Sequence, residues 1–283
     1  MLELRRCEHG QAALAEVAAL IRRVIPRARE IDAGFLAWDY AGCPVGPAVG
    51  INAYEDGVLV GHIAGTPFRA QLAGREERGL NLHHAVTDPS RGGRGIFKSF
   101  VRAVLEAGAA EGYGFVVGLP NANSTFGVVE RIGFQLVRPL GVKLGFGAIP
   151  ERDEALQPGF ARLWNGAELA WRLARPGAHY RVQRRGAHAS VFAPAGFPGA
   201  VAELGTFPAS WLPDTLAETR SPGLLRVWAG LDPARRWSRK PYLDLPRRWL
   251  PAPLNFVFFD LTGSGRRLEP AGLRVDLLDF DAF

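Results

Sequence analysis

Apolar and polar residues alternate along the first ninety residues in patterns that change from helical to strand-like spacing. Residues 1–8 predict a short strand. The next apolar residues recur every three or four positions, which is one face of a helix, at Leu14, Val17, Ala18, Ile21, Val24 and Ile25. The segment from Ile31 to Ala48 is rich in glycine, proline and aromatic residues, and predicts a loop.

Three strands are predicted next. Val49–Tyr54 and Gly57–Thr66 flank Glu55-Asp56-Gly57, and an Asp-Gly pair between apolar stretches is typical of a β-hairpin. A polar turn at residues 74–79 leads into the third strand, Gly79–Thr87.

A glycine-rich turn and a helix follow that strand. Apolar residues behind the turn share one helical face, namely Ile96, Phe97, Phe100, Val101, Val104 and Leu105. Three further elements are then predicted: a buried strand at Tyr113–Leu119, a short helix at Ser124–Arg131 and a strand at Phe134–Phe146. The order β-α-β-β-β-α-β-α-β indicates an α/β protein, with a mixed sheet and helices on both faces.

The sequence predicts two domains, 1–150 and 151–283, because the composition becomes polar around Glu151–Gln157. Both lengths are near the usual domain size. The second half has its own predicted strands, at Tyr180–Gln183, Ala187–Ala193, Leu224–Ala229 and Leu254–Leu261.

A possible internal repeat links the two halves. Leu36-Ala37-Trp38 is followed by Pro44 and a hairpin, and Leu169-Ala170-Trp171 is followed by Pro176 and a hairpin. The tripeptides lie 133 residues apart. We interpret this shared succession as a duplication.

Composition narrows the class of protein. The net charge is +6, but nearly all the basic residues are arginines, with lysine only at positions 98, 143 and 240. We attribute that bias to a GC-rich genome, and predict no nucleic-acid partner. The segment Arg235–Lys240 mixes basic side chains with Trp237, as nucleic-acid sites do, and we interpret it as a solvated loop.

Other classes are also disfavoured. No apolar stretch reaches the roughly 20 residues that cross a bilayer, and the start of the chain has no signal-peptide pattern. We therefore expect a soluble, cytoplasmic protein. Cys7 and Cys43 alone make a disulfide framework or a cysteine zinc site improbable. We predict no metal site, because adjacent residues such as His83 and His84 on one strand cannot easily reach one ion.

The strongest chemical signal is the segment from His83 to Phe97. A strand ends near Pro89, a glycine-rich turn follows, and a helix begins at once. Such a turn aims backbone N–H groups into one concavity at a helix N-terminus, which suits a pyrophosphate. Arg91 and Arg94 add positive charge. The spacing matches neither a P-loop nor a dinucleotide fingerprint.

This segment resembles the phosphate loop of the GNAT acetyltransferase superfamily, Gln/Arg-x-x-Gly-x-Gly/Ala. Gly92 takes the Gln/Arg place, Gly95 the central glycine and Phe97 the last position, so two of three positions depart from the general pattern. The Gly-Ile-Phe ending resembles a branch of larger GNAT proteins. Three segments are also similar to that branch: Phe35–Gly46, Pro120–Ser124 and Glu130–Phe134.

The resemblance implies a GNAT-like acyl-CoA N-acyltransferase fold in two tandem units, the second degenerate and contributing to the acceptor site. The co-substrate would be acetyl-CoA or another acyl-CoA, and the acceptor a small-molecule or peptide amine. The implied cofactor-binding residues are Ala85, Val86, Thr87, Gly92, Gly93, Arg94, Gly95, Ile96, Phe97 and Asn123.

The implied reaction needs a base for the amine and a donor for the oxyanion. His84 and His83 are the catalytic candidates, because histidine titrates near neutral pH and their strand should pass the thioester. Alternation along a strand allows only one of them to face the acceptor. Backbone N–H groups of Leu82–Thr87 could stabilise the oxyanion. Less favoured candidates for acceptor binding or deprotonation are His62, Asp260, Asp279 and Asp281.

One position leaves the activity open. Many GNAT enzymes have a tyrosine as thiolate acid four residues before the glycine of the Gly-Phe pair, and that position here is Val129. Water, Tyr113 or Tyr40 could replace it. The alternative is a non-catalytic CoA-binding or scaffold protein with the same fold.

Overall fold

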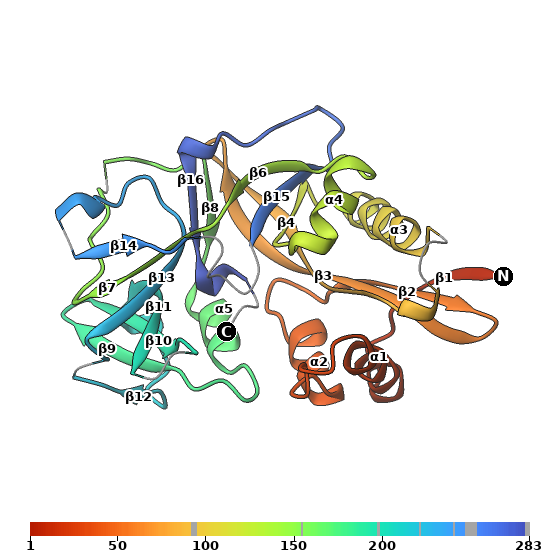
Figure 1. Ribbon diagram of the computed structural model, residues 1–283, viewed down its shortest axis with the longest axis horizontal. Helices are drawn as coiled ribbons and strands as arrows, with labels where there is room; N and C mark the ends of the chain where they lie inside the picture. Colours follow the sequence, from red (N-terminus) through yellow and green to blue (C-terminus); the bar gives the residue numbers. More distant parts are fainter. Residues whose placement is uncertain are drawn as a thin grey trace.

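The computed structural model describes residues 1–91, 95–153, 155–196, 199–220, 222–239, 241–246 and 254–280 (Figure 1). Strands from both halves of the chain join into one mixed sheet of sixteen strands. No helix in these ranges is long and apolar enough to cross a membrane.

The first half follows the predicted α/β succession, except that a helix lies in the predicted loop and the predicted strand Phe134–Phe146 is divided into two. Its elements are β1 (Leu2–Arg6), α1 (Gln11–Val24), α2 (Ala33–Ala41), β2 (Val49–Glu55), β3 (Val58–Leu72), β4 (Arg75–Thr87), α3 (Ile96–Ala110), β5 (Phe115–Gly118), α4 (Ala122–Glu130), β6 (Gln135–Pro139) and β7 (Gly141–Phe146). The hairpin at Asp56-Gly57 is confirmed. Both residues have positive φ, 52° and 79°, as a tight turn matched to the strand twist requires.

The predicted loop between Ile31 and Ala48 is wrong in one part, because α2 lies inside it. The Asp32 side chain caps this helix by accepting the backbone N–H of Phe35 at 2.8 Å. Phe35 and Tyr40 are buried beneath the sheet. Burial of these aromatic side chains therefore stabilises a helix in a segment whose composition is typical of loops.

Two helical layers cover opposite faces of the first half of the sheet (Figure 1). The α3 face packs Phe100 and Val104 against β-strand residues such as Ile51. The α1–α2 face packs Leu36 and Tyr40 against others such as Ala64. This second face carries the site described below.

The second half contains one described α-helix and nine strands. Its elements are β8 (Phe160–Leu163), α5 (Gly166–Leu173), β9 (Arg181–Arg185), β10 (His188–Pro194), β11 (Ala200–Pro208), β12 (Ala217–Glu218), β13 (Leu225–Leu231), β14 (Tyr242–Asp244), β15 (Asn255–Asp260) and β16 (Leu273–Asp276). The predicted hairpin and the two later predicted strands correspond to β9–β10, β13 and β15.

The two halves repeat one strand topology. In the first, β2 pairs with β3 and β3 with β4 antiparallel, and β4 pairs with β5 parallel. In the second, β9–β10 and β10–β11 are antiparallel and β11–β13 is parallel.

Strands also cross between the halves. β15, from near the end of the chain, lies between β5 and β6. β7, from the first half, lies beside β13 and β14. Each half therefore completes the sheet of the other, and these pairings run across the predicted division at residue 150.

Candidate functional site

A β-bulge in β4 is the feature around which the site is built. Ala64 pairs with His83 and His62 pairs with Val86, so His84 and Ala85 together oppose Ile63. His84 has a φ of 51°, which is uncommon for a residue other than glycine. Bulges are frequent next to active sites because they redirect side chains.

The bulge shifts the alternation of side chains along β4. Before it, Leu80 and Leu82 pack in the α3-side core. After it, Val86 packs in the α1–α2 core, although regular alternation would put this even-numbered residue on the same face as Leu82. The extra residue therefore reverses the faces of the side chains that follow it, so that those after the bulge point to the face opposite to the one that regular alternation would give them.

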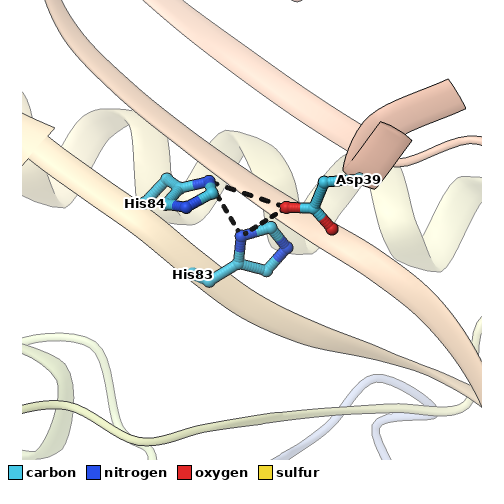
Figure 2. A group of neighbouring side chains, drawn as sticks. All are labelled: Asp39, His83 and His84. Atoms are coloured by element: carbon cyan, nitrogen blue, oxygen red, sulfur yellow. Dashed lines mark hydrogen bonds and ion pairs between the residues drawn. The ribbon is translucent and has the colours of Figure 1, made fainter. Parts of the chain in front are cut away.

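Both histidines consequently lie on one face, so the expectation that they point to opposite faces of the strand is wrong. Their Nδ1 atoms are 3.0 Å apart. Asp39 on α2 joins them, with its Oδ2 atom 3.4 Å from Nδ1 of His83 and 3.8 Å from Nδ1 of His84 (Figure 2). We call Asp39, His83 and His84 the histidine cluster. All three side chains are nearly buried.

One chain of hydrogen bonds fixes the tautomer of His84. His62 is fully buried, and burial holds the pKa of its imidazole well below 6.5, so the ring is neutral. Its Nδ1–H donates to Asn52 Oδ1 at 2.6 Å, which leaves Nε2 to accept from the Tyr40 hydroxyl at 2.8 Å. That hydroxyl has then used its proton, so it accepts from His84 Nδ1–H at 3.0 Å.

A second chain fixes the tautomer of His83. The Thr66 hydroxyl donates to Asp39 Oδ1 at 3.2 Å. It therefore accepts from His83 Nε2–H at 2.7 Å. The lone pair of His83 then sits on Nδ1, facing the Asp39 carboxylate and the Nδ1–H of His84. A proton taken up at this atom would be stabilised by the adjacent carboxylate.

The histidine cluster also has the spacing of metal ligands. One donor atom from each of its three side chains lies within 4.8 Å of the others. The argument that two adjacent histidines could not reach one ion is therefore wrong, again because of the bulge. Within the described ranges, these residues could hold a divalent cation such as Zn²⁺, which accepts histidine and carboxylate ligands.

His83 opens onto a small cavity between the two halves of the chain. We call it the central cavity. Its wall is formed by residues of the β-strands, of α2 and α5, and of the last part of the described chain. These residues are Trp38, Asp39, Thr66, Asn81, His83, Arg162, Trp171, Arg172, Asp279 and Phe280. Asp279 is the one less-favoured acceptor candidate found there, and burial raises the pKa of its carboxyl to about 6.

The other edge of β4 is open next to the bulge. β4 pairs with β5 only from Gly79 to Leu82, whereas β4 continues to Thr87. In the described chain, no strand pairs with residues 83–87 on that side. The backbone of Ala85, Val86 and Thr87, three of the predicted cofactor-binding residues, therefore lies beyond the end of β5, on an edge of β4 that has no strand partner in the described chain.

The predicted phosphate loop is only partly described. Gly92, Gly93 and Arg94 lie outside the described residues. Gly95 is the N-cap of α3 with a φ of 76°, which favours glycine. Ile96 is buried in the α3-side core, and the ring of Phe97 packs against Phe100.

Asn123 and Val129 lie on α4. Asn123 is exposed in the first turn of the helix, where its backbone N–H is held by the Asn121 side chain. Val129 packs against the α3-side core.

The remaining candidate residues differ in where they lie relative to the site. Tyr40 is part of the hydrogen-bond chain, whereas Tyr113 is buried beside Arg78, near the opposite end of β4. Asp260 is held by Thr262 and Arg266, which keep the pKa of its carboxyl well below its ordinary value. Asp281 lies outside the described residues.

The mixed basic and aromatic segment around Trp237 is packed rather than freely solvated. Its indole contacts the rings of Trp228 and Tyr242. The Arg235 guanidinium donates to the backbone carbonyl of Pro150.

The side chains of the site that were not predicted from the sequence include Asp39, Thr66, Asn81 and Arg162. Asn81 had a usable signal, because it lies two residues before His83 and therefore on the same face of the strand. Asp39 was hidden by the assignment of its segment to a loop. Thr66 and Arg162 reach the cavity only through strand pairing over long distances in the chain.

Comparison with known proteins gives one family match. Residues 45–137 match a family model described as an acetyltransferase (GNAT) domain. No sequence among the curated proteins matches the chain.

Solved structures extend the similarity to most of the chain. A GCN5-related N-acetyltransferase from Anabaena variabilis ATCC 29413 superposes with a TM-score of 0.61 at 9% identity, over 92% of this chain and 73% of that one. Eis1 from Mycobacterium abscessus gives 0.58 at 10%, over 92% and 74%. A GCN5-related N-acetyltransferase from Kribbella flavida gives 0.59 at 13%, over 91% and 71%. At these identities the likeness shows the fold alone.

Proposed function

The chain belongs to the GNAT superfamily, and on that premise we propose that it transfers an acyl group, most simply acetyl, from acyl-CoA to an amine. The observation that carries the proposal is the bulge in β4. It puts His83 in the wall of the central cavity with His84 beside it, while the adjoining edge of the same strand is left without a strand partner and could receive a cofactor.

The open edge of β4 suits the pantetheine arm of CoA. That arm carries two amides, which can pair with backbone groups as a neighbouring strand would. The diphosphate would then reach the turn at residues 92–97 and the N-terminus of α3, where backbone N–H groups and the helix dipole favour negative charge. The thioester would lie near the bulge.

The oxyanion would be stabilised by the backbone of the bulge. A β-bulge leaves its extra residue outside the regular ladder. The N–H of His84 or Ala85 is therefore the favoured donor to the carbonyl oxygen as it gains charge. A donor held rigidly by a strand costs no reorganisation during the reaction.

His83 is our proposed base. The amine nitrogen attacks the thioester carbon, the C–N bond forms, and the C–S bond breaks. The proton lost by nitrogen passes to Nδ1 of His83, where Asp39 stabilises the resulting imidazolium. The thiolate takes a proton from solvent, since a thiol pKa near about 8.5 makes this step undemanding.

The acceptor would enter the central cavity, where α5 and the last described residues meet α2. The second half would thus shape the acceptor site, with Trp171 as one wall. A second candidate function is CoA binding without catalysis, favoured by Val129, which cannot act as an acid. The residues of the histidine cluster then have only a structural role.

Release of free thiol from acetyl-CoA, measured against a panel of amines, distinguishes the two functions. We expect release that depends on the acceptor and stays unchanged after treatment with EDTA. Tight binding of CoA by calorimetry, without release for any amine, would favour the non-catalytic protein. Loss of release on EDTA treatment, with recovery on adding Zn²⁺, would replace the histidine base by a metal at the histidine cluster.

A further inference from the structure

Arg162 is a half-buried cation in the wall of the central cavity, and its Nε atom is buried. It projects from β8, with its guanidinium carbon 3.8 Å from the ring centre of Trp164 and 5.3 Å from that of Phe68. Burial lowers the pKa of the guanidinium to about 10. The group therefore stays charged at neutral pH.

The hydrogen bond that this guanidinium makes leaves other N–H donors of the group without a partner among the described residues. Nη1 donates to the backbone carbonyl of Asp279 at 2.9 Å. Nε is buried and has no partner among the described residues. In the same ranges, no carboxylate forms an ion pair with Arg162.

Among the described residues, the carboxylate that acts most strongly on Arg162 is that of Asp279, and it is already engaged. The Asp279 carboxylate accepts from Trp164 Nε1 at 3.0 Å and from the backbone N–H of Asp276 at 2.8 Å. The negative charge of Asp279 partly offsets the positive charge of Arg162, but no hydrogen bond joins the two side chains in the described ranges. A guanidinium presents five donors in a planar fork that matches a carboxylate.

Asn81 provides a hydrogen-bond acceptor that has no donor among the described residues. Its side chain is buried, and Oδ1 has no donor in the described part of the chain. It lies two residues before His83 on β4 and lines the same cavity. An unpaired acceptor therefore sits beside the proposed base, while an unpaired donor lies on another wall. Buried polar groups of both kinds are costly unless a ligand or water meets them.

We propose that the acceptor is a small amino acid, whose carboxylate pairs with Arg162 and whose amine approaches Asn81 Oδ1 and His83. The inference rests on the proposed acyl transfer and names its substrate class. The ammonium form of the substrate would donate to Asn81, and loss of a proton to His83 would free the lone pair that attacks. The stacked indoles of Trp38 and Trp171 would limit the size of the side chain.

The test compares L-α-amino acids with their primary amides as acceptors in thiol release. The amine of an amide is less basic, so more of it is neutral, and an enzyme indifferent to the carboxylate would prefer the amide. We expect the wild type to prefer the acid by about 10- to 100-fold in kcat/KM, the range expected for a bond between charged groups. Arg162→Gln should abolish that preference, and Arg162→Lys should keep part of it.

Asn81→Leu is the matched control. It should lower kcat/KM for acid and amide alike, because its partner is the amine they share. Thermal unfolding of each variant checks that it folds. Equal rates for acid and amide in the wild type, or an equal loss of both in Arg162→Gln, would overturn the inference.

A binding measurement separates this inference from the proposed function. Trp38 and Trp171 line the cavity, so quenching of tryptophan fluorescence should report the acid and amide without catalysis. If no amine supports thiol release, the proposed transfer fails. Tighter binding of the acid, lost in Arg162→Gln, would still support the carboxylate site, and equal binding would refute it.

Discussion

Trp38 and Trp171 exchange hydrogen bonds in a reciprocal pair. The indole N–H of each donates to the backbone carbonyl of the other, and both distances are 2.9 Å. Their rings stack with centres 5.2 Å apart and planes inclined by 21°. A contact in which residue i meets j as j meets i is the signature of two-fold symmetry, here between two segments of one chain.

The helices that carry these residues are equivalent as well. α2 begins after Asp32 and α5 after Asn165, and each cap side chain accepts the backbone N–H three residues later. The spacing of 133 residues that suggested a duplication in the sequence thus relates two capped helices that face one another. This contact, together with the repeated strand topology, supports the predicted duplication.

The reciprocal pair should contribute to stability from both sides equally. Trp38→Phe and Trp171→Phe each remove one hydrogen bond while keeping an aromatic ring, so we expect each to lower the free energy of unfolding by about 1 kcal/mol. For a chain of this size that corresponds to roughly 2–4 °C in Tm. Urea and thermal unfolding measure the change.

The double variant tests the symmetry. Because the residues share one contact, the two losses should not add, and a coupling of at least about 0.5 kcal/mol is expected. Trp211→Phe, at a partly exposed indole, is the control and should change little. Strictly additive losses would mean that the two hydrogen bonds form independently of each other.

Local signals in the sequence were sufficient for most elements of the fold. The hairpin at Asp56-Gly57 depends only on two adjacent residues, and α3 only on the spacing of its apolar face. The site needed information that local patterns lack. The bulge at His84 is one extra residue opposite Ile63. The pattern of apolar and polar residues in β4 does not indicate this bulge, because it can be detected only when Val86 is known to lie on the same face as His83.

The crossing of strands between the halves was also beyond local patterns. β15 was predicted as a strand from its apolar residues, but its place between β5 and β6 depends on contacts more than a hundred residues apart in the chain. Arg162 and Asn81 meet in the central cavity for the same reason. The helices and strands were therefore predictable from the sequence. Which of their residues come together at the site was mostly not predictable.

Binding of CoA should depend on charge at position 95. Gly95 has a positive φ, and a Cβ there would meet no atom of the described chain within 4 Å, so asparagine and aspartate should fold equally well. Gly95→Asp adds a negative charge beside the proposed diphosphate site, and we expect at least about a tenfold loss of affinity. Gly95→Asn should retain most of the binding.

Calorimetry with CoA measures both variants and also counts the sites. We expect one CoA per chain, because the segment 133 residues after the loop forms β13 and not a turn before a helix. Equal affinity in the aspartate and asparagine variants would remove the cofactor assignment at this turn. Two sites per chain would show that the second half also binds CoA.

The two histidines should differ in their effect on the rate. His83→Ala removes the proposed base, and we expect kcat to fall by about 100-fold or more, with loss of the acidic limb of the pH–rate profile. His84→Ala leaves the base in place but removes the N–H that faces it. We expect a smaller loss and a shifted limb, which is the behaviour of a positioning residue.

Val129→Ala is the control for this comparison. Valine has no proton to give, so the rate should change only slightly and the profile should keep its shape. Both profiles are measured by thiol release at saturating acetyl-CoA. Wild-type rates and profiles in both histidine variants would exclude the histidines from proton transfer.

His62 should make the folded protein sensitive to acid. Its pKa lies well below 6.5 because of burial, and Tyr40, His83 and His84 face it from the same network. The unfolded chain binds a proton at this residue once the pH falls below about 6.5, while the folded chain does not. Stability from His62 is therefore fully present above that pH and is lost as the pH falls, by at most about 1.4 kcal/mol per pH unit.

His62→Gln tests that sign. Glutamine can accept the Tyr40 hydrogen bond but cannot take up a proton, so this variant should be less stable than the wild type at pH 7.5 and should lose less between pH 7.5 and 5.5. We expect the two Tm curves to converge by roughly 2–4 °C over this interval, as about 1 kcal/mol would produce in a chain of this size. The other five histidines are present in both proteins, so the difference between the curves isolates His62. Parallel curves would mean that His62 binds a proton as readily in the folded chain as in the unfolded one. The neutral His62 ring, from which the hydrogen-bond direction of Tyr40 and the tautomer of His84 were derived, would then have to be abandoned.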